Sequence, residues 1–164
     1  MAAVNCNYSG EPVYTSWYDN SSRGYLDITG VSYETTNGRY TISWSLKLGD
    51  KGNGRYNFAA AAAWIDGSEV NFTHGADNYS TYWFYNQWSN GSTVASGTFT
   101  TTKTSVSLSV KAMFDGGYTS ARWNNNQYCV SGSGTLSIVA PTIGSPSVSF
   151  STVSRDRTNI TASI

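Results

Sequence analysis

Charge is scarce in this chain of 164 residues, and the two signs cancel. Only 12% of the residues are charged, with ten Lys and Arg against ten Asp and Glu. A nucleic-acid interface needs a basic field, and a surface for cationic partners needs an acidic one. The composition provides neither, so we expect no nucleic-acid partner.

Long hydrophobic runs are also missing. The longest, from Phe58 to Ile65, falls far short of the roughly 20 residues that span a bilayer. Residues 1–6 lack the charged and apolar regions of a secretory signal. We therefore expect that the protein does not insert into a membrane. We expect it to be made in a cytosol and released to the exterior by lysis. Removal of a signal sequence would fit equally.

Few residues could support metal or nucleophile chemistry. Two cysteines and one histidine, His74, cannot complete a four-ligand zinc site without carboxylates, and no CxxC pair occurs. His74 has no nucleophile motif nearby, and the chain has no GxSxG and no phosphate-binding loop. The sequence predicts no catalytic residue, no metal and no cofactor. Scattered carboxylates could still meet in space, which keeps a hydrolase as the third interpretation.

The two cysteines, Cys6 and Cys129, admit two interpretations. A disulfide between them would close a long loop. In the chain-entropy model this would stabilise the folded state by up to about 4–5 kcal/mol. The first and last strands of a sandwich often adjoin, so the pairing is geometrically plausible. The alternative is two free thiols, the usual state in a cytosol.

Aromatic and small polar residues make up much of the chain instead. Aromatics reach 15%, with six Trp and twelve Tyr, which is typical of β-sheets with neutral surfaces rich in hydroxyls and amides. The clearest strand is 40–48, where five apolar side chains from Tyr40 to Leu48 alternate with Thr, Ser and Lys. The run 58–65 favours helix by its five alanines but precedes the hairpin signal Asp66-Gly67, so we expect a buried strand.

About nine short strands separated by Gly, Asn and Asp turns predict an all-β fold, an antiparallel immunoglobulin-like or jelly-roll-type β-sandwich. The sandwich domain is expected over 1–140. A Pro-containing connector follows at 141–146, and 147–164 is a C-terminal arm or the start of a further immunoglobulin-like domain. The expected strands are 25–33, 40–48, 56–65, the hairpin arm at 68–70, 80–88, 92–101, 104–114, 118–123 and 127–139.

Carbohydrate binding is the sharpest chemical hypothesis. Trp and Tyr rings stack on the C–H faces of sugars, and amide side chains bond their hydroxyls. The alternative is that these rings are core residues, as sandwich cores commonly use aromatics. The candidate binding residues lie near expected turns and are Trp17, Tyr18, Trp88, Trp123, Asn125 and Gln127.

Four pieces of the chain carry a resemblance to a known family. They are the Trp-bearing strand 40–48, the hairpin 64–70, the strand 104–112 and the closing strand 131–138. Over roughly residues 24–164 their order resembles the β-sandwich domains in minor structural (tail and baseplate) proteins of tailed bacteriophages, particularly siphoviruses of Gram-positive hosts. In that family a closing strand leads into a Pro-containing connector and further immunoglobulin-like domains. The resemblance implies a setting on the virion exterior and no particular site residue.

The resemblance and the composition together predict a non-enzymatic structural or adhesion module of a bacteriophage virion, in the tail, the baseplate or a surface decoration. Its expected partners are other virion proteins, copies of itself and a host cell-wall polysaccharide. The alternative is a free-standing lectin or carbohydrate-binding module of a bacterial surface protein, located outside the cell.

Overall fold

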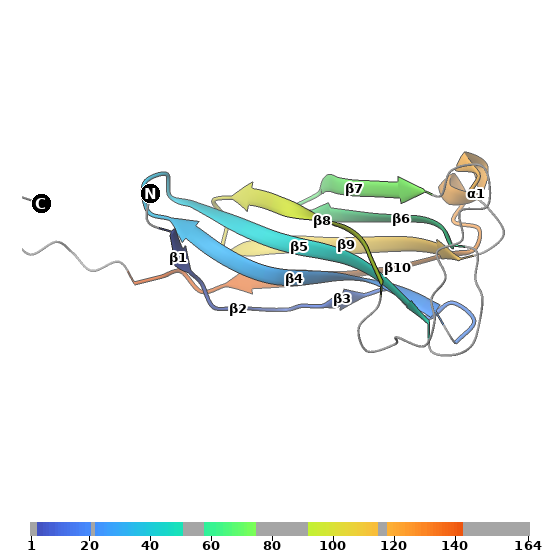
Figure 1. Ribbon diagram of the computed structural model, residues 1–164, viewed down its shortest axis with the longest axis horizontal. Coiled ribbons are helices and arrows are strands. Elements are labelled where there is room, and N and C mark those ends of the chain that lie inside the picture. Colours follow the sequence, from blue (N-terminus) through green and yellow to red (C-terminus); the bar gives the residue numbers. More distant parts are fainter. Residues whose placement is uncertain (1–2, 21, 51–57, 75–91, 115–117, 143–164) are drawn as a thin grey trace, which may run out of the picture.

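The protein is a sandwich of two antiparallel β-sheets, as the sequence predicted (Figure 1). The computed structural model describes residues 3–20, 22–50, 58–74, 92–114 and 118–142. Within these ranges the elements are β1 (Ala3–Asn5), β2 (Tyr8–Ser9), β3 (Val13–Tyr14), β4 (Ser22–Glu34), β5 (Arg39–Asp50), β6 (Phe58–Ile65), β7 (Ser68–His74), β8 (Ser92–Thr101), β9 (Ser105–Phe114), α1 (Ser120–Asn124) and β10 (Cys129–Ile138).

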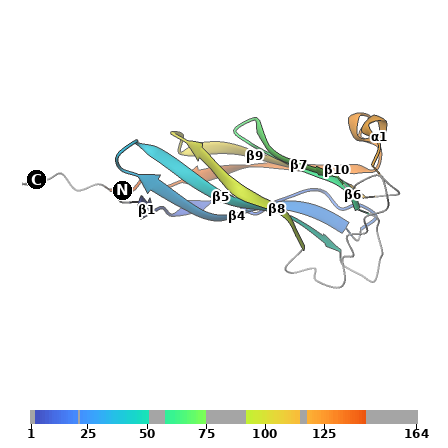
Figure 2. The same cartoon turned by 45° about the horizontal axis from the view of Figure 1, so that its top comes forward.

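The strands divide into two sheets of five, which Figure 2 shows as two layers. The β5 sheet has the order β1-β4-β5-β8, with β3 also paired to β4. The β9 sheet has the order β2-β10-β9-β6-β7. The described residues thus form ten strands, against about nine expected. The three N-terminal strands were not expected, and the strand expected at 80–88 lies outside the described residues.

The core lies between the sheets and follows the alternation of the sequence. The five apolar side chains of 40–48 are all buried, and so are the inward positions Val106, Leu108, Val110 and Ala112 of β9. Burial on one face selects one register, since a shift by one residue would turn every apolar side chain outward. Both strand predictions are confirmed.

The alanine run forms a strand, which confirms the expectation over helix. β6 is an inner strand between β9 and β7, and Ala60 to Ala63 have no exposed surface. Ala61 and Ala63 face the core, while Ala60 belongs to a second apolar cluster on the outer face. Small side chains fit here because both faces of the strand are covered.

The N-terminal segment, residues 3–18, closes one seam of the sandwich by bonding to both sheets. Cys6 and Thr15 donate backbone hydrogen bonds to β4, at 2.9 Å each. Ser16 donates to Ser131 of β10 at 3.1 Å. The segment passes so close to β10 that a Cβ on Gly132 would lie 1.8 Å from the carbonyl oxygen of Tyr14. The glycines of the closing strand therefore make room for the N-terminal segment.

Residues 118–123 do not form the expected strand. The helix α1 begins at Ser120 instead, and the side chain of Thr119 accepts a hydrogen bond from the backbone N–H of Arg122. Thr at the N-cap satisfies one of the open amides of the first turn. This local cap outweighs the strand propensity of the aromatic residues around it.

The possible Cys6–Cys129 disulfide is not formed, because both cysteines are free. Cys6 bonds to Val31 near the β1 end of the molecule, whereas Cys129 pairs with Met113 near α1 at the opposite end (Figure 1). A disulfide requires Cα atoms within about 7 Å. The alternative of two free thiols is the state that the structure shows.

The last strand ends close to the predicted domain boundary. β10 stops at Ile138, and the backbone N–H of Val139 donates to Asn7 at 2.8 Å. Most of the predicted connector and the whole of the predicted arm at 147–164 lie outside the described residues, so this division stays a prediction. No helix within the described ranges is both long and apolar enough to cross a membrane.

Candidate carbohydrate-binding site

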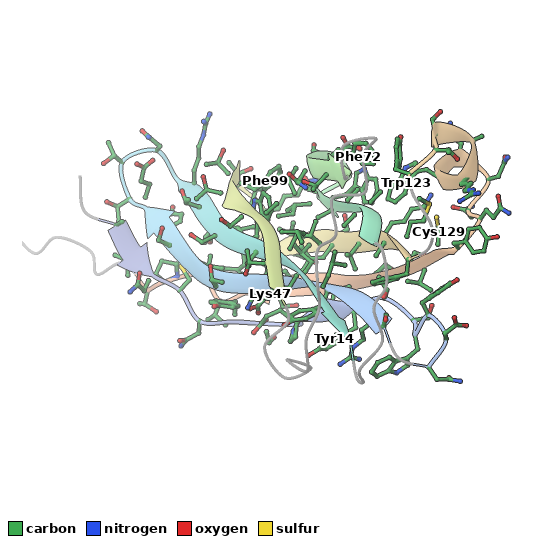
Figure 3. The ribbon with its side chains drawn as sticks, turned by 45° about the vertical axis from the view of Figure 1, so that its right-hand side comes forward. Tyr14, Lys47, Phe72, Phe99, Trp123 and Cys129 are labelled. Atoms are coloured by element: carbon green, nitrogen blue, oxygen red, sulfur yellow. The ribbon has the colours of Figure 1, made fainter. Side chains whose placement is uncertain are left out.

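An aromatic cluster lies on the outer face of the β9 sheet, beside α1 (Figure 3). The rings of Phe72 and Trp123 meet edge to face at 5.2 Å, and those of Phe72 and Tyr118 at 5.7 Å. They cover Ala60 and Met113, which have no exposed surface. We call this cluster the Trp123 patch and include in it the turn residues Asn125 and Gln127; its other members are Phe72, Lys111, Tyr118, Arg122, Trp123, Tyr128 and Cys129.

The strand β9 fixes the position of Trp123 through Lys111. The ammonium of Lys111 donates a 2.7 Å hydrogen bond to the carbonyl oxygen of Trp123, which lies in the last turn of α1. The same ammonium lies 4.2 Å from the centroid of the indole ring. A cation at a helix C-terminus and over an indole face is favourable on both counts. The half-buried Trp123 ring is thus anchored on its strand side.

The turn after α1 presents amide side chains next to this ring. The backbone N–H groups of Asn125 and Gln127 bond back to Ala121 and Arg122, at 3.0 and 2.8 Å. Both side chains are exposed, as is that of Asn126, whose φ of 56° lies in the left-handed region that Asn tolerates. Three of the predicted site residues, Trp123, Asn125 and Gln127, therefore share one turn.

The Trp123 patch is positively charged. Its two cations are Lys111 and Arg122, and the guanidinium of Arg122 lies 5.5 Å from the ring centroid of Tyr128. The ion pairs formed among the described residues are Lys47–Asp27 and Lys103–Asp66, both outside the patch. Burial raises the pKa of the Cys129 thiol, and Lys111 partly opposes this shift.

The remaining predicted residues do not join the Trp123 patch. Trp17 lies 4.7 Å from the guanidinium of Arg23, which also lies 3.7 Å over the ring of Tyr14. Tyr14 and Trp123 lie on opposite sides of the sandwich in Figure 3. The structure thus separates Trp17 from the residues of the α1 turn.

Tyr18 packs against the core. Its ring stacks on Phe114 at 5.8 Å with an interplanar angle of 24°, and it packs against the main core cluster. Trp88 lies outside the described residues. The six predicted residues therefore contribute three members to one surface.

Sequence reasoning missed Phe72, Lys111 and Arg122. One signal for Lys111 was available. It is the only charged residue of β9, where it follows Ser105, Ser107 and Ser109 on the outward face of the strand. Nothing in the local pattern links it to Trp123, because the contact depends on α1 folding back over the sheet.

Metal and acid–base chemistry find little support in this surface. Across the described residues, no three His, Cys, Asp or Glu side chains gather where they could hold a metal ion. The side chain of His74 is not described. The chemistry that the Trp123 patch offers is ring stacking, amide hydrogen bonding and positive charge.

Comparisons with protein-family models, curated proteins and solved structures find no match to this chain.

Proposed function

We propose that the chain is a non-enzymatic structural and adhesion module of a bacteriophage virion, and that its Trp123 patch contacts carbohydrate on the host cell. One observation carries the carbohydrate part of the proposal. It is the half-buried indole of Trp123, held by Phe72 and Lys111 beside the exposed side chains of Asn125 and Gln127. The virion setting rests on the resemblance of the sequence's strand patterns to those of tail and baseplate domains.

The arrangement of the patch suits sugars. A pyranose ring presents a flat C–H face that stacks on an aromatic ring, and hydroxyls around its rim that bond to amides. Asn and Gln each offer a donor and an acceptor, as a sugar hydroxyl requires. Because Lys111 and Phe72 hold the indole in place, little side-chain entropy remains to be lost on binding.

The strand order supports an immunoglobulin-like type of sandwich. Leaving β1 to β3 aside, the chain places β4 and β5 in one sheet and β6 and β7 in the other. It then returns with β8 beside β5, and ends with β9 beside β6 and β10 beside β9. Immunoglobulin-like sandwiches alternate between their sheets in this way. An experimental structure in which β8 does not adjoin β5 would contradict the assignment.

Assembly with copies of itself is supported by the edge strand β8. Among the described residues β8 pairs with β5 alone, and its ten residues carry no charge and no proline. Edge strands in monomeric proteins are commonly blocked by such residues. Several copies in one particle would convert weak single-site sugar affinity into firm attachment.

The test of the carbohydrate part is glycan-array binding by the whole chain, followed by calorimetry on the best ligand. Trp123→Ala should weaken binding by about fivefold or more, since loss of a stacking aromatic costs about 1–3 kcal/mol. Trp17→Ala is the matched control, because Trp17 is also half-buried but lies on the other side of the sandwich, and it should bind as the parent does. Equal loss in both variants, or no glycan bound at all, would count against the site.

The free-standing lectin remains the alternative, because the Trp123 patch would serve it equally well. Sedimentation velocity separates the two at concentrations of tens of micromolar. Self-association supports the virion module, whereas a monomer that binds glycan with Trp123 intact favours the lectin.

A further inference from the structure

The Trp123 patch contains positive charge that stacking on a neutral sugar does not use. Lys111 and Arg122 both lie in it, and neither forms an ion pair with a carboxylate of the described residues. The whole chain has no net charge and few charged residues. Two cations that no described carboxylate pairs with are therefore a local feature of this patch.

Among the described residues, no carboxylate pairs with the ammonium of Lys111. Its ammonium is partly buried between the indole ring and the carbonyl oxygen of Trp123. An ammonium has three donors, and the carbonyl oxygen takes one. Removing an ammonium from water is costly unless an anion or several acceptors replace the lost solvation. A ligand oxygen with negative charge would supply the missing partner.

Arg122 extends the same charge along the turn. It lies one residue before Trp123, its backbone carbonyl bonds Gln127, and its guanidinium lies near the ring of Tyr128. A guanidinium binds carboxylate or phosphate through two parallel N–H groups, a geometry that neutral hydroxyls cannot match. Lys111 thus lies against the ring of Trp123, and Arg122 lies against the ring of Tyr128 in the same patch.

We propose that the ligand of the Trp123 patch is an anionic glycan, in which a sugar ring stacks on Trp123 while a carboxylate or phosphate group pairs with Lys111 and Arg122. This inference rests on the proposed carbohydrate-binding function and names its ligand class. Asn125 and Gln127 would bond the hydroxyls of the same sugar or of its neighbour.

The test compares oligogalacturonate with the same oligomer after methyl esterification, which removes the charge and keeps the sugar ring. Calorimetry should show tighter binding of the acid form, with affinity that falls as salt rises from about 50 to 300 mM, because charge pairs are screened. Lys111→Met and Arg122→Gln should each weaken binding of the acid form about threefold to fivefold, the upper range for partly exposed ion pairs. Arg122→Gln should leave the binding of the ester unchanged, because its guanidinium lies over Tyr128. Lys111→Met also removes a contact that holds the indole, so it should weaken binding of the acid more than binding of the ester.

Lys103→Met is the matched control. Lys103 pairs with Asp66 and lies outside the patch, so its loss should leave both affinities as they are. If Lys111→Met loosens the fold, Arg122→Gln provides the second measurement. Measuring poly(glycerol phosphate) in place of oligogalacturonate tells whether phosphate or carboxylate is preferred. The proposal is supported if either polymer binds in a salt-sensitive way and its binding depends on Lys111 or Arg122.

Two results separate this inference from the function on which it rests. Equal affinity for acid and ester, lost in Trp123→Ala but kept in Lys111→Met and Arg122→Gln, overturns the anionic ligand and leaves carbohydrate binding intact. Failure to bind the acid, the ester, the phosphate polymer and every neutral glycan overturns both.

Discussion

Replacing Gly132 by Ala should detach the N-terminal segment from β10. The new Cβ would lie 1.8 Å from the carbonyl oxygen of Tyr14 and 2.6 Å from its carbonyl carbon. Both are backbone atoms, so no side-chain rotation relieves the overlap. Either the N-terminal segment or β10 must move by more than an ångström.

The cost follows from what that movement breaks. Val13, which is only 5% exposed, would lose its place in the core, at about 1.5–3 kcal/mol. The hydrogen bond from Ser16 to Ser131 would be lost as well, at about 1 kcal/mol. We expect the free energy of unfolding to fall by about 2.5–4 kcal/mol, a large part of the 5–15 kcal/mol typical of a domain.

Urea unfolding followed by Trp fluorescence measures this change, and Gly30→Ala is the matched control. Gly30 also lies in a strand, but a Cβ there would meet no atom within 4 Å. The control should stay within about 1 kcal/mol of the parent. Hydrogen exchange should show loss of protection at the amides of Thr15 and Ser16 in Gly132→Ala.

The packing argument would be refuted by a Gly132→Ala protein with the same urea midpoint as Gly30→Ala. It would also be refuted if Gly132→Ala lost the expected stability while the amides of the N-terminal segment remained protected from exchange. In either case β10 would have room that the structure does not show.

Two further predictions concern the cysteines and the ion pair between Lys47 and Asp27. Intact mass should be the same with and without reductant, and native alkylation should modify Cys129 before Cys6, because Cys6 is buried and Cys129 is only partly so. The hydrogen bond to Asp27 raises the pKa of Lys47 above its ordinary 10.5. The protonated lysine therefore adds stability that is fully present below pH 10.5 and is lost as the pH rises through the higher folded pKa. Urea midpoints from pH 8 to 11 should fall less steeply in Asp27→Asn than in the parent, and equal slopes would contradict the coupling.

Much of the sandwich was predictable because burial leaves a periodic trace. A strand with one buried face must alternate, so 40–48 and 104–114 could be assigned with their inward faces. The alanine run needed the neighbouring Asp66-Gly67 turn as well, since propensity alone favoured helix. These predictions depend on residue patterns within a single strand and its adjoining turn.

The exceptions come from contacts with distant parts of the chain or from end effects. The stretch 118–123 has strand-like aromatic residues, but Thr119 caps a helix there. The short strands β1 to β3 have little periodicity, because the N-terminal segment crosses between the sheets and bonds each only briefly. A pattern of two or three residues is too short to be recognised.

The candidate site was half predictable for the same reason. Trp123, Asn125 and Gln127 are near neighbours in the sequence, so a single turn could be proposed to hold them. Phe72 and Lys111 come from strands that the fold brings under α1, and no local pattern indicates that. Trp17 was a separate candidate beside Tyr18, and in the structure it contacts Arg23.

The amino-acid sequence was sufficient to assign the class of this protein: an all-β sandwich of neutral, aromatic-rich composition. It did so because alternation and turn chemistry are local consequences of burying one face of each strand. Only the tertiary structure decided that the cysteines stay apart, that Gly132 makes room for the N-terminal segment, and that a lysine of β9 lies beneath Trp123. Those outcomes depend on which strands become neighbours, and the energy that selects the neighbours comes from packing across the whole core.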